Sequence, residues 1–183
     1  WSLVCDGLGA SGIFGGLTAE VMTNFAKHYV TTAPVSVVDI LTFEQVAHDI
    51  WNITVANTQN LYRRLAAHIA DDSEPLFDNP NDPIEQYISE DLKTQIISYI
   101  KETKANDPQN GAINLLKEIG AMDTTAALVY VTSDSRGKIA HIAHTGDTQV
   151  FAIEDDGFDN IEFVSLTDND GLAKKAFGGN SPL

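Results

Sequence analysis

Aspartate residues follow several of the strands that the sequence predicts. Asp6 ends the first apolar run, and Asp147 lies in a turn between two later strands. Asp168 and Asp170 follow the last predicted strand. Carboxylates at strand ends are held by a rigid sheet and can converge on one cation, and Mg²⁺ or Mn²⁺ prefers such all-oxygen ligands. A pair of these cations can activate water and clamp a phosphoryl group for in-line attack. Because Asp also favours turns for conformational reasons, a local turn alone does not define a metal site.

The elements that would position these carboxylates begin with helices. Residues 13–29 predict a helix because apolar residues recur at spacings of three and four, namely Phe14, Leu17, Val21 and Phe25. Thr42 and Gln45 form a capping box, which predicts that a second helix begins at Thr42. Its apolar face continues to about residue 70.

An acidic stretch with several prolines, residues 71–83, predicts a loop after the second helix. Beyond it, apolar residues at helical spacing predict a third helix, marked by Ile84, Ile88, Leu92, Ile96 and Ile100. A short helix at residues 113–119 follows, with Gly120 as its C-cap.

From residue 124 onward, the sequence pattern changes from helical to β-type. Besides the first strand at residues 3–5, short β-type runs occupy residues 124–132, 139–144, 150–153 and 161–166. The connections between them are tight turns, which favours an antiparallel meander. Helices that come first and a meander that comes later predict an α+β domain or a layered sandwich, not alternating strands and helices.

Composition excludes several classes of function. The chain has 183 residues, enough for one domain with a sizeable core, and a formal net charge of -15. Such a surface repels nucleic-acid phosphates and anionic lipids, so we expect neither as a partner. No apolar stretch approaches the roughly 20 residues that a membrane-spanning helix needs, so we expect no membrane insertion. The single cysteine, Cys5, permits no internal disulfide and suits a cytoplasmic protein.

Several short segments resemble motifs of the metal-dependent, type-2C-like family of serine/threonine protein phosphatases, in its bacterial-type form. The segments occur in the family's order and span nearly the whole chain: Val4-Cys5-Asp6-Gly7-Leu8-Gly9, Ala56-Asn57 with Leu61-Tyr62, Ala121-Met122-Asp123-Thr124-Thr125-Ala126, Ile142-Ala143-His144-Thr145-Gly146-Asp147-Thr148, Leu166-Thr167-Asp168-Asn169-Asp170 and Ala176-Phe177-Gly178-Gly179. Each motif is weak alone, and the identification depends on their shared order.

The resemblance implies a four-layer α-β-β-α sandwich with two antiparallel sheets and an active site that holds two Mg²⁺ or Mn²⁺ ions. It implies that Asp6 is the catalytic residue that bridges the metals, and that Gly7 binds one metal through its backbone carbonyl. Asp147 would lie near a further, weaker cation site. The implied reaction is hydrolysis of phosphomonoesters on a phosphorylated protein substrate, by metal-activated water and without a covalent phosphoenzyme.

The chain departs from the family's pattern at several positions. Leu8 stands where some members have a histidine proposed as general acid, and Asp123 replaces the usual glycine. Residues 71–120 form an acidic, helical insertion, either a recognition element or a structural pad. The resemblance implies a phosphate-binding arginine on a strand before Trp1 and two further metal-binding aspartates after Gly178-Gly179, and the sequence given contains neither. We therefore expect a single, partial catalytic domain over residues 1–183, incomplete at both ends, and inactive as written or part of a longer active protein.

Two other functions are compatible with the same residues. Gly7, Gly9 and Gly12 form a G-x-G-x-x-G pattern between a strand and a helix, the fingerprint of a dinucleotide-binding Rossmann-type domain. Asp39 could then bind a ribose hydroxyl. Against this alternative, Asp6 would place a carboxylate beside the pyrophosphate, and the later meander lacks the helices of a parallel sheet. The other alternative is a non-catalytic binding module on the phosphatase fold.

Overall fold

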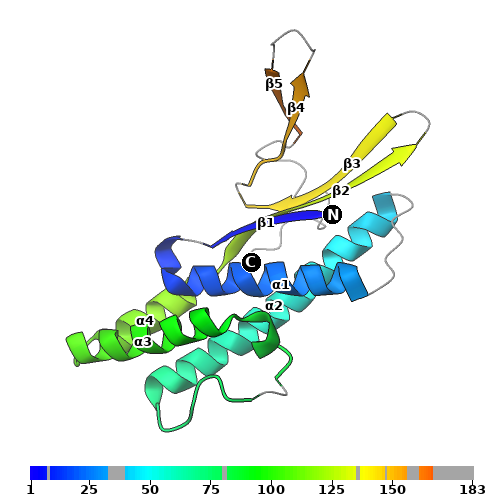
Figure 1. Cartoon of the computed structure of the whole chain (residues 1–183). Helices are drawn as coiled ribbons and strands as arrows, with labels where there is room; N and C mark the ends of the chain where they lie inside the picture. Colours follow the sequence, from blue (N-terminus) through cyan, green and yellow to red (C-terminus); the bar gives the residue numbers. More distant parts are fainter. Residues whose placement is uncertain are drawn as a thin grey trace. The chain divides into compact units, whose positions relative to one another are not determined.

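The computed structural model describes residues 1–7, 9–32, 40–79, 82–134, 137–146, 148–155 and 161–166 (Figure 1). The chain forms two compact units. The helical unit contains residues 5–34 and 49–124, and the sheet unit contains residues 1–4, 35–48 and 125–183. The division falls within the first strand and within the second helix, so each unit is built from segments that are distant in sequence.

The helical unit is organised around α1 (Ile13–Thr32), the later part of α2 (Ile40–Ala70), α3 (Glu90–Asn106) and α4 (Gly111–Gly120). Helices α3 and α4 lie side by side (Figure 1). Their apolar faces meet in one core of buried side chains: Phe14, Leu17, Val21, Leu61, Leu65, Ile69, Leu76, Ile84, Ile88, Ile96, Ile100, Leu115 and Ile119. Burial of each such side chain contributes about 1.5–3 kcal/mol. Residues 84–119 therefore share their core with α1 and are integral to this unit.

Helix boundaries differ from the sequence predictions in three places. Helix α2 begins at Ile40, so Thr42 lies in its first turn and the N-cap prediction is wrong. Helix α3 begins only at Glu90, because Ser89 caps it by accepting a hydrogen bond from the Leu92 backbone N–H. The apolar residues before Ser89 flank a short 3₁₀ helix, η2 (Glu85–Tyr87), and are buried without belonging to α3. Gly120 is the last residue of α4, and Ala121 is the C-cap.

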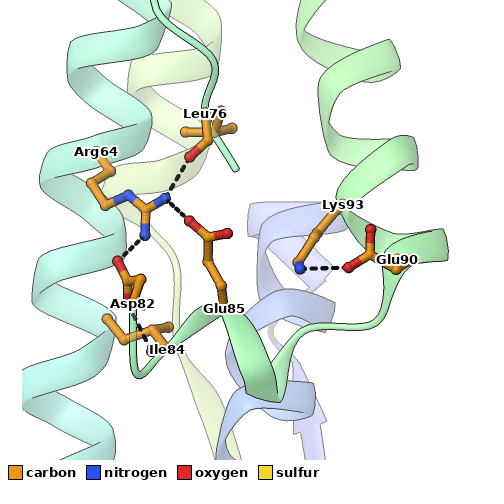
Figure 2. A network of polar contacts seen from close by, with 7 residues as sticks. All are labelled: Arg64, Leu76, Asp82, Ile84, Glu85, Glu90 and Lys93. Atoms are coloured by element: carbon orange, nitrogen blue, oxygen red, sulfur yellow. Dashed lines mark hydrogen bonds and ion pairs between the residues drawn. The ribbon is translucent and has the colours of Figure 1, made fainter. Parts of the chain in front are cut away.

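The loop predicted at residues 71–83 is attached to α2 by polar contacts. Arg64 of α2 donates to the Asp82 and Glu85 carboxylates and to the Leu76 carbonyl (Figure 2). The loop therefore packs on the helix through both its backbone and its acidic side chains.

The principal sheet has the strand order β1-β2-β3, with β1 spanning Ser2–Gly7. Strands β2 (Thr124–Asp134) and β3 (Gly137–Thr145) pair antiparallel, with Tyr130 opposite His141 and Ala127 opposite His144. His141 and His144 therefore face opposite sides of the sheet, as their odd spacing predicts. In the sheet unit, the Trp1 ring packs on Phe43 and Tyr130, whose ring also contacts His141.

Strands β4 (Phe151–Asp155) and β5 (Ile161–Ser165) form a separate antiparallel pair. The predicted strands are thus confirmed, but they fall into two sheets and do not form one continuous meander. Helices and antiparallel strands together make a mixed α/β structure, which agrees with the predicted α+β class at a coarse level. Within the described ranges, no helix combines the length and hydrophobicity needed to cross a membrane.

Candidate functional site

Asp6 lies near the end of β1 on the exposed side of the strand. Side chains along β1 alternate between exposed and half-buried positions, and Asp6 follows the half-buried Cys5. The next residue, Gly7, packs against the backbone of α1. A Cβ on Gly7 would lie 2.2 Å from the Gly15 carbonyl carbon and 2.7 Å from the Gly16 nitrogen. Only glycine fits at position 7, so the packing of β1 on α1 determines where the Asp6 carboxylate is presented.

Thr124, at the start of β2, binds directly to the backbone of Asp6. Its hydroxyl donates to the Asp6 carbonyl oxygen at 2.9 Å, and its side chain is buried. The Thr124 backbone N–H donates a hydrogen bond to Asp123 Oδ1 at 2.8 Å. Two segments singled out in the sequence are therefore adjacent in the fold, although 118 residues separate Asp6 from Thr124.

The glycine-rich turn between β1 and α1 lies beside a carboxylate from α4. The Gly12 backbone N–H donates to the Gly9 carbonyl, which closes the turn. A Cβ on Gly12 would lie 3.9 Å from Glu118 Oε2. Tyr99 holds this carboxylate by donating its hydroxyl to it at 2.9 Å. An anionic pyrophosphate would therefore meet Glu118 at the turn, whereas a cation would be favoured there.

The end of β3 comes close to the start of β2 in the sheet unit. Gly146 has a φ of +73°, and a Cβ there would lie 2.5 Å from Thr125 Cγ2. Glycine is thus required both by the backbone conformation and by the space. Thr125 directly follows Thr124 in β2.

Several predicted site residues lie outside the described residues. They are Leu8, Asp39, Asp147, Asp168, Asp170 and residues 176–179. The predictions for Asp147 as a cation ligand and for the last acidic turn therefore stay predictions.

The oxygen atoms offered near Asp6 are of the type that a hard cation prefers as ligands. The Asp6 carboxylate and the Gly7 carbonyl offer oxygen atoms, which Mg²⁺ and Mn²⁺ prefer. Within the described ranges, however, no three His, Cys, Asp or Glu side chains are close enough to hold one metal ion. The described residues thus supply part of a metal site, and we derive no reaction step through a metal.

Sequence reasoning overlooked the roles of Thr124 and Glu118, and it did not predict the burial of His144. His144 is 3 % exposed, and neither ring nitrogen has a hydrogen-bond partner among the residues that the structure describes. The odd spacing of the two histidines predicts that the His144 side chain turns away from His141, but no sequence signal predicts its burial.

Cys5 is a half-buried free cysteine in β1. Burial raises the pKa of the Cys5 thiol, and a hydrogen bond with Thr23 opposes this shift only in part. The thiolate, which is the reactive form, is therefore scarce.

Comparison of the chain with protein-family models, with curated proteins and with solved structures found no match.

Proposed function

We propose that this chain is part of a metal-dependent serine/threonine phosphoprotein phosphatase of the type-2C-like family. The hydrogen bond from Thr124 to the Asp6 carbonyl carries the proposal. The two residues come from segments that resemble different motifs of that family, and a hydrogen bond joins them. Their adjacency supports the proposal, because a shared site requires the two segments to lie together.

The other polar and packing contacts support the same assignment. Gly7 is fixed against α1, Gly146 is fixed against Thr125, and each belongs to a separate motif of the resemblance. A bound pair of Mg²⁺ or Mn²⁺ ions would supply an activated water for hydrolysis. The chain's own contribution is to hold the Asp6 carboxylate at the exposed end of β1 and to place negative charge from Asp123 nearby.

The finer fold belongs to this proposal as well. We expect the sheet of β1, β2 and β3 to form one layer of a four-layer α-β-β-α sandwich. The substrate is proposed to be a phosphorylated protein, and the location the cytoplasm. Both proposals rest on the family resemblance and not on a contact among the described residues.

A dinucleotide-binding function is less well supported by the same geometry. The Gly7, Gly9 and Gly12 pattern does lie between a strand and a helix, as that function requires. However, Glu118 lies against the turn, and β2 and β3 pair antiparallel, whereas the dinucleotide-binding fold is built on parallel strands.

The decisive experiment measures hydrolysis of p-nitrophenyl phosphate with and without Mn²⁺. It compares this chain, its Asp6→Ala variant and the product of the full open reading frame. Mn²⁺-dependent turnover that disappears in the Asp6→Ala form of an active protein supports the phosphatase function. Folded proteins that show no turnover in any form would favour the non-catalytic binding module, and tight NAD binding unaffected by Mn²⁺ would favour the dinucleotide-binding domain.

A further inference from the structure

Asn110 and Gly111 form the junction between α3 and α4, and this pair of residues carries a chemistry of its own. Asparagine is among the chemically labile residues of proteins. It is most labile before glycine, because glycine has no Cβ to shield its backbone nitrogen from the preceding side chain. Asn110 is exposed and is the N-cap residue of α4. Its side-chain amide is therefore open to water.

The native fold holds the two residues away from this reaction. The Gly111 backbone N–H donates to the Asp107 carbonyl at 2.7 Å, which directs the nitrogen at that oxygen. The Asp107 carboxylate accepts hydrogen bonds from the Asn110 backbone N–H at 3.0 Å and from its side-chain amide at 3.4 Å. Ring closure needs the Asn110 side chain and the Gly111 nitrogen on the same side of the Cα–C bond, and a ψ of -11° keeps them apart. The junction must therefore open before the two groups can react.

We propose that Asn110 is a site of spontaneous deamidation whose rate is set by opening of the α3–α4 junction. In the open form, the deprotonated Gly111 nitrogen attacks Asn110 Cγ. The new N–Cγ bond closes a succinimide ring, and the Cγ–Nδ2 bond breaks to release ammonia. Water, the only co-reactant, then opens the ring. Attack of water at Cγ gives aspartate, and attack at the α-carbonyl carbon gives isoaspartate, in which the main chain runs through the side-chain carbons.

Isoaspartate does not fit this junction, because it adds one carbon to the main chain directly before a tightly packed glycine. A Cβ on Gly111 would already lie 2.6 Å from the Thr103 carbonyl oxygen and 3.1 Å from the Lys104 Cα. Helix α4 contributes Leu115 and Ile119 to the core of the helical unit. Isoaspartate should therefore prevent the junction from closing and loosen the packing of α4.

The test follows the tryptic peptide of residues 105–117 by mass spectrometry while the whole chain is incubated in mildly alkaline buffer. Chromatography separates the asparaginyl, aspartyl and isoaspartyl forms, and a synthetic peptide of the same residues gives the rate without the fold. Asp107→Ala removes the carboxylate that holds Asn110, whereas Asp107→Asn keeps a carbonyl oxygen that can accept. Gln109→Ala is the matched control, because Gln109 is an exposed neighbour in the same turn. Each variant is also measured as a peptide, so that intrinsic reactivity cancels.

We expect the whole chain to lose the Asn110 amide more than about tenfold more slowly than the peptide, because the reactive form is a minor, locally opened state. Asp107→Ala should accelerate the loss in the whole chain by about 3- to 10-fold, the range that corresponds to one hydrogen bond of ordinary strength. Asp107→Asn and Gln109→Ala should both stay within about twofold of the unmodified chain. Chain that has accumulated isoaspartate should unfold at a lower urea concentration than fresh chain.

Several results would overturn the inference. Equal rates in the chain and the peptide would show that the junction gives no protection, and absence of isoaspartate in the peptide would remove the chemistry. An unchanged rate in Asp107→Ala, or an equal acceleration by Gln109→Ala, would refute the role of the Asp107 carboxylate. Urea unfolding of every variant separates opening of the junction from a global loss of stability. If Asp107→Ala does not fold, the comparison of the unmodified chain with the peptide still decides the proposal.

Discussion

Removal of the Arg64 guanidinium should detach the loop that follows α2. Arg64 donates through Nη1 to Asp82 and through Nη2 to both Glu85 and the Leu76 carbonyl, each at 2.5 Å (Figure 2). Its guanidinium also lies 5.8 Å from the centre of the Phe77 ring. The substitution Arg64→Met keeps much of the apolar stem and removes every one of these polar contacts.

The expected cost follows from how deeply the charges are buried. The exposed fractions of the side chains are 27 % for Arg64, 16 % for Asp82 and 8 % for Glu85. Breaking a fully buried ion pair costs about 3–5 kcal/mol, because the remaining charge is left buried without its partner. Since Arg64 is partly exposed, we expect Arg64→Met to lower the free energy of unfolding by about 2–3 kcal/mol, less than the fully buried case.

Urea unfolding followed by far-ultraviolet circular dichroism measures this loss. The matched control is Arg63→Met, because Arg63 is exposed and donates a hydrogen bond of 3.2 Å to Asn60 on its own helix. The control should change stability by less than about 0.5 kcal/mol. A second change, Glu85→Gln, should recover part of the loss in the Arg64→Met protein, because it removes the buried charge that was left unpaired. If Arg64→Met is no less stable than Arg63→Met, the loop is not held by this guanidinium.

Three further predictions concern the region around the candidate site. Gly7→Ala should lower the free energy of unfolding by about 1–3 kcal/mol, because the new Cβ would overlap the backbone of α1. Gly9 has open space around it, so Gly9→Ala should change the free energy of unfolding by about 0.5 kcal/mol or less. Equal urea midpoints for the two variants would contradict this. Because its pKa is raised, the Cys5 thiol should react with Ellman's reagent at pH 8 more than about tenfold slower in the folded chain than in guanidinium chloride, and equal rates would show an accessible thiolate. Burial raises the pKa of the Tyr99 hydroxyl, and the nearby Glu118 carboxylate raises it further. The contribution of protonated Tyr99 to stability is therefore complete below pH 10 and is lost as the pH rises through the pKa of the folded protein. Tyr99→Phe should therefore flatten the decline of the urea midpoint above pH 10, and an unchanged slope would refute the assignment.

The helical pattern of the sequence predicted most elements because each has a continuous apolar face. The predictions failed at the ends of helices, where a single contact determines the boundary. Ile84 and Ile88 keep helical spacing with Leu92, yet Ser89 caps α3 between them and its backbone N–H donates to Glu20 of α1. A tertiary partner on another helix, which periodicity does not encode, thus sets where α3 begins.

The candidate site was predictable only where it is local. Asp6 and Gly7 could be placed at a strand end from the pattern around them. The contact between Asp6 and Thr124 depends on which strands are neighbours in the sheet, and this pairing becomes visible in the sequence only through a resemblance to a family. The carboxylate of Glu118 was missed because the helix that carries it packs on the glycine turn through non-local contacts.

Packing and the placement of the Asp6 carboxylate are coupled at the end of β1. The backbone of α1 requires glycine at position 7, and the same close packing fixes the chain just after Asp6. Thr124 fixes the carbonyl of Asp6 from the other side. A substitution that loosens either contact should therefore both destabilise the helical unit and misplace the Asp6 carboxylate. It follows that loss of turnover in a Gly7 variant would identify no catalytic residue by itself, because the same substitution disturbs the packing of β1 on α1.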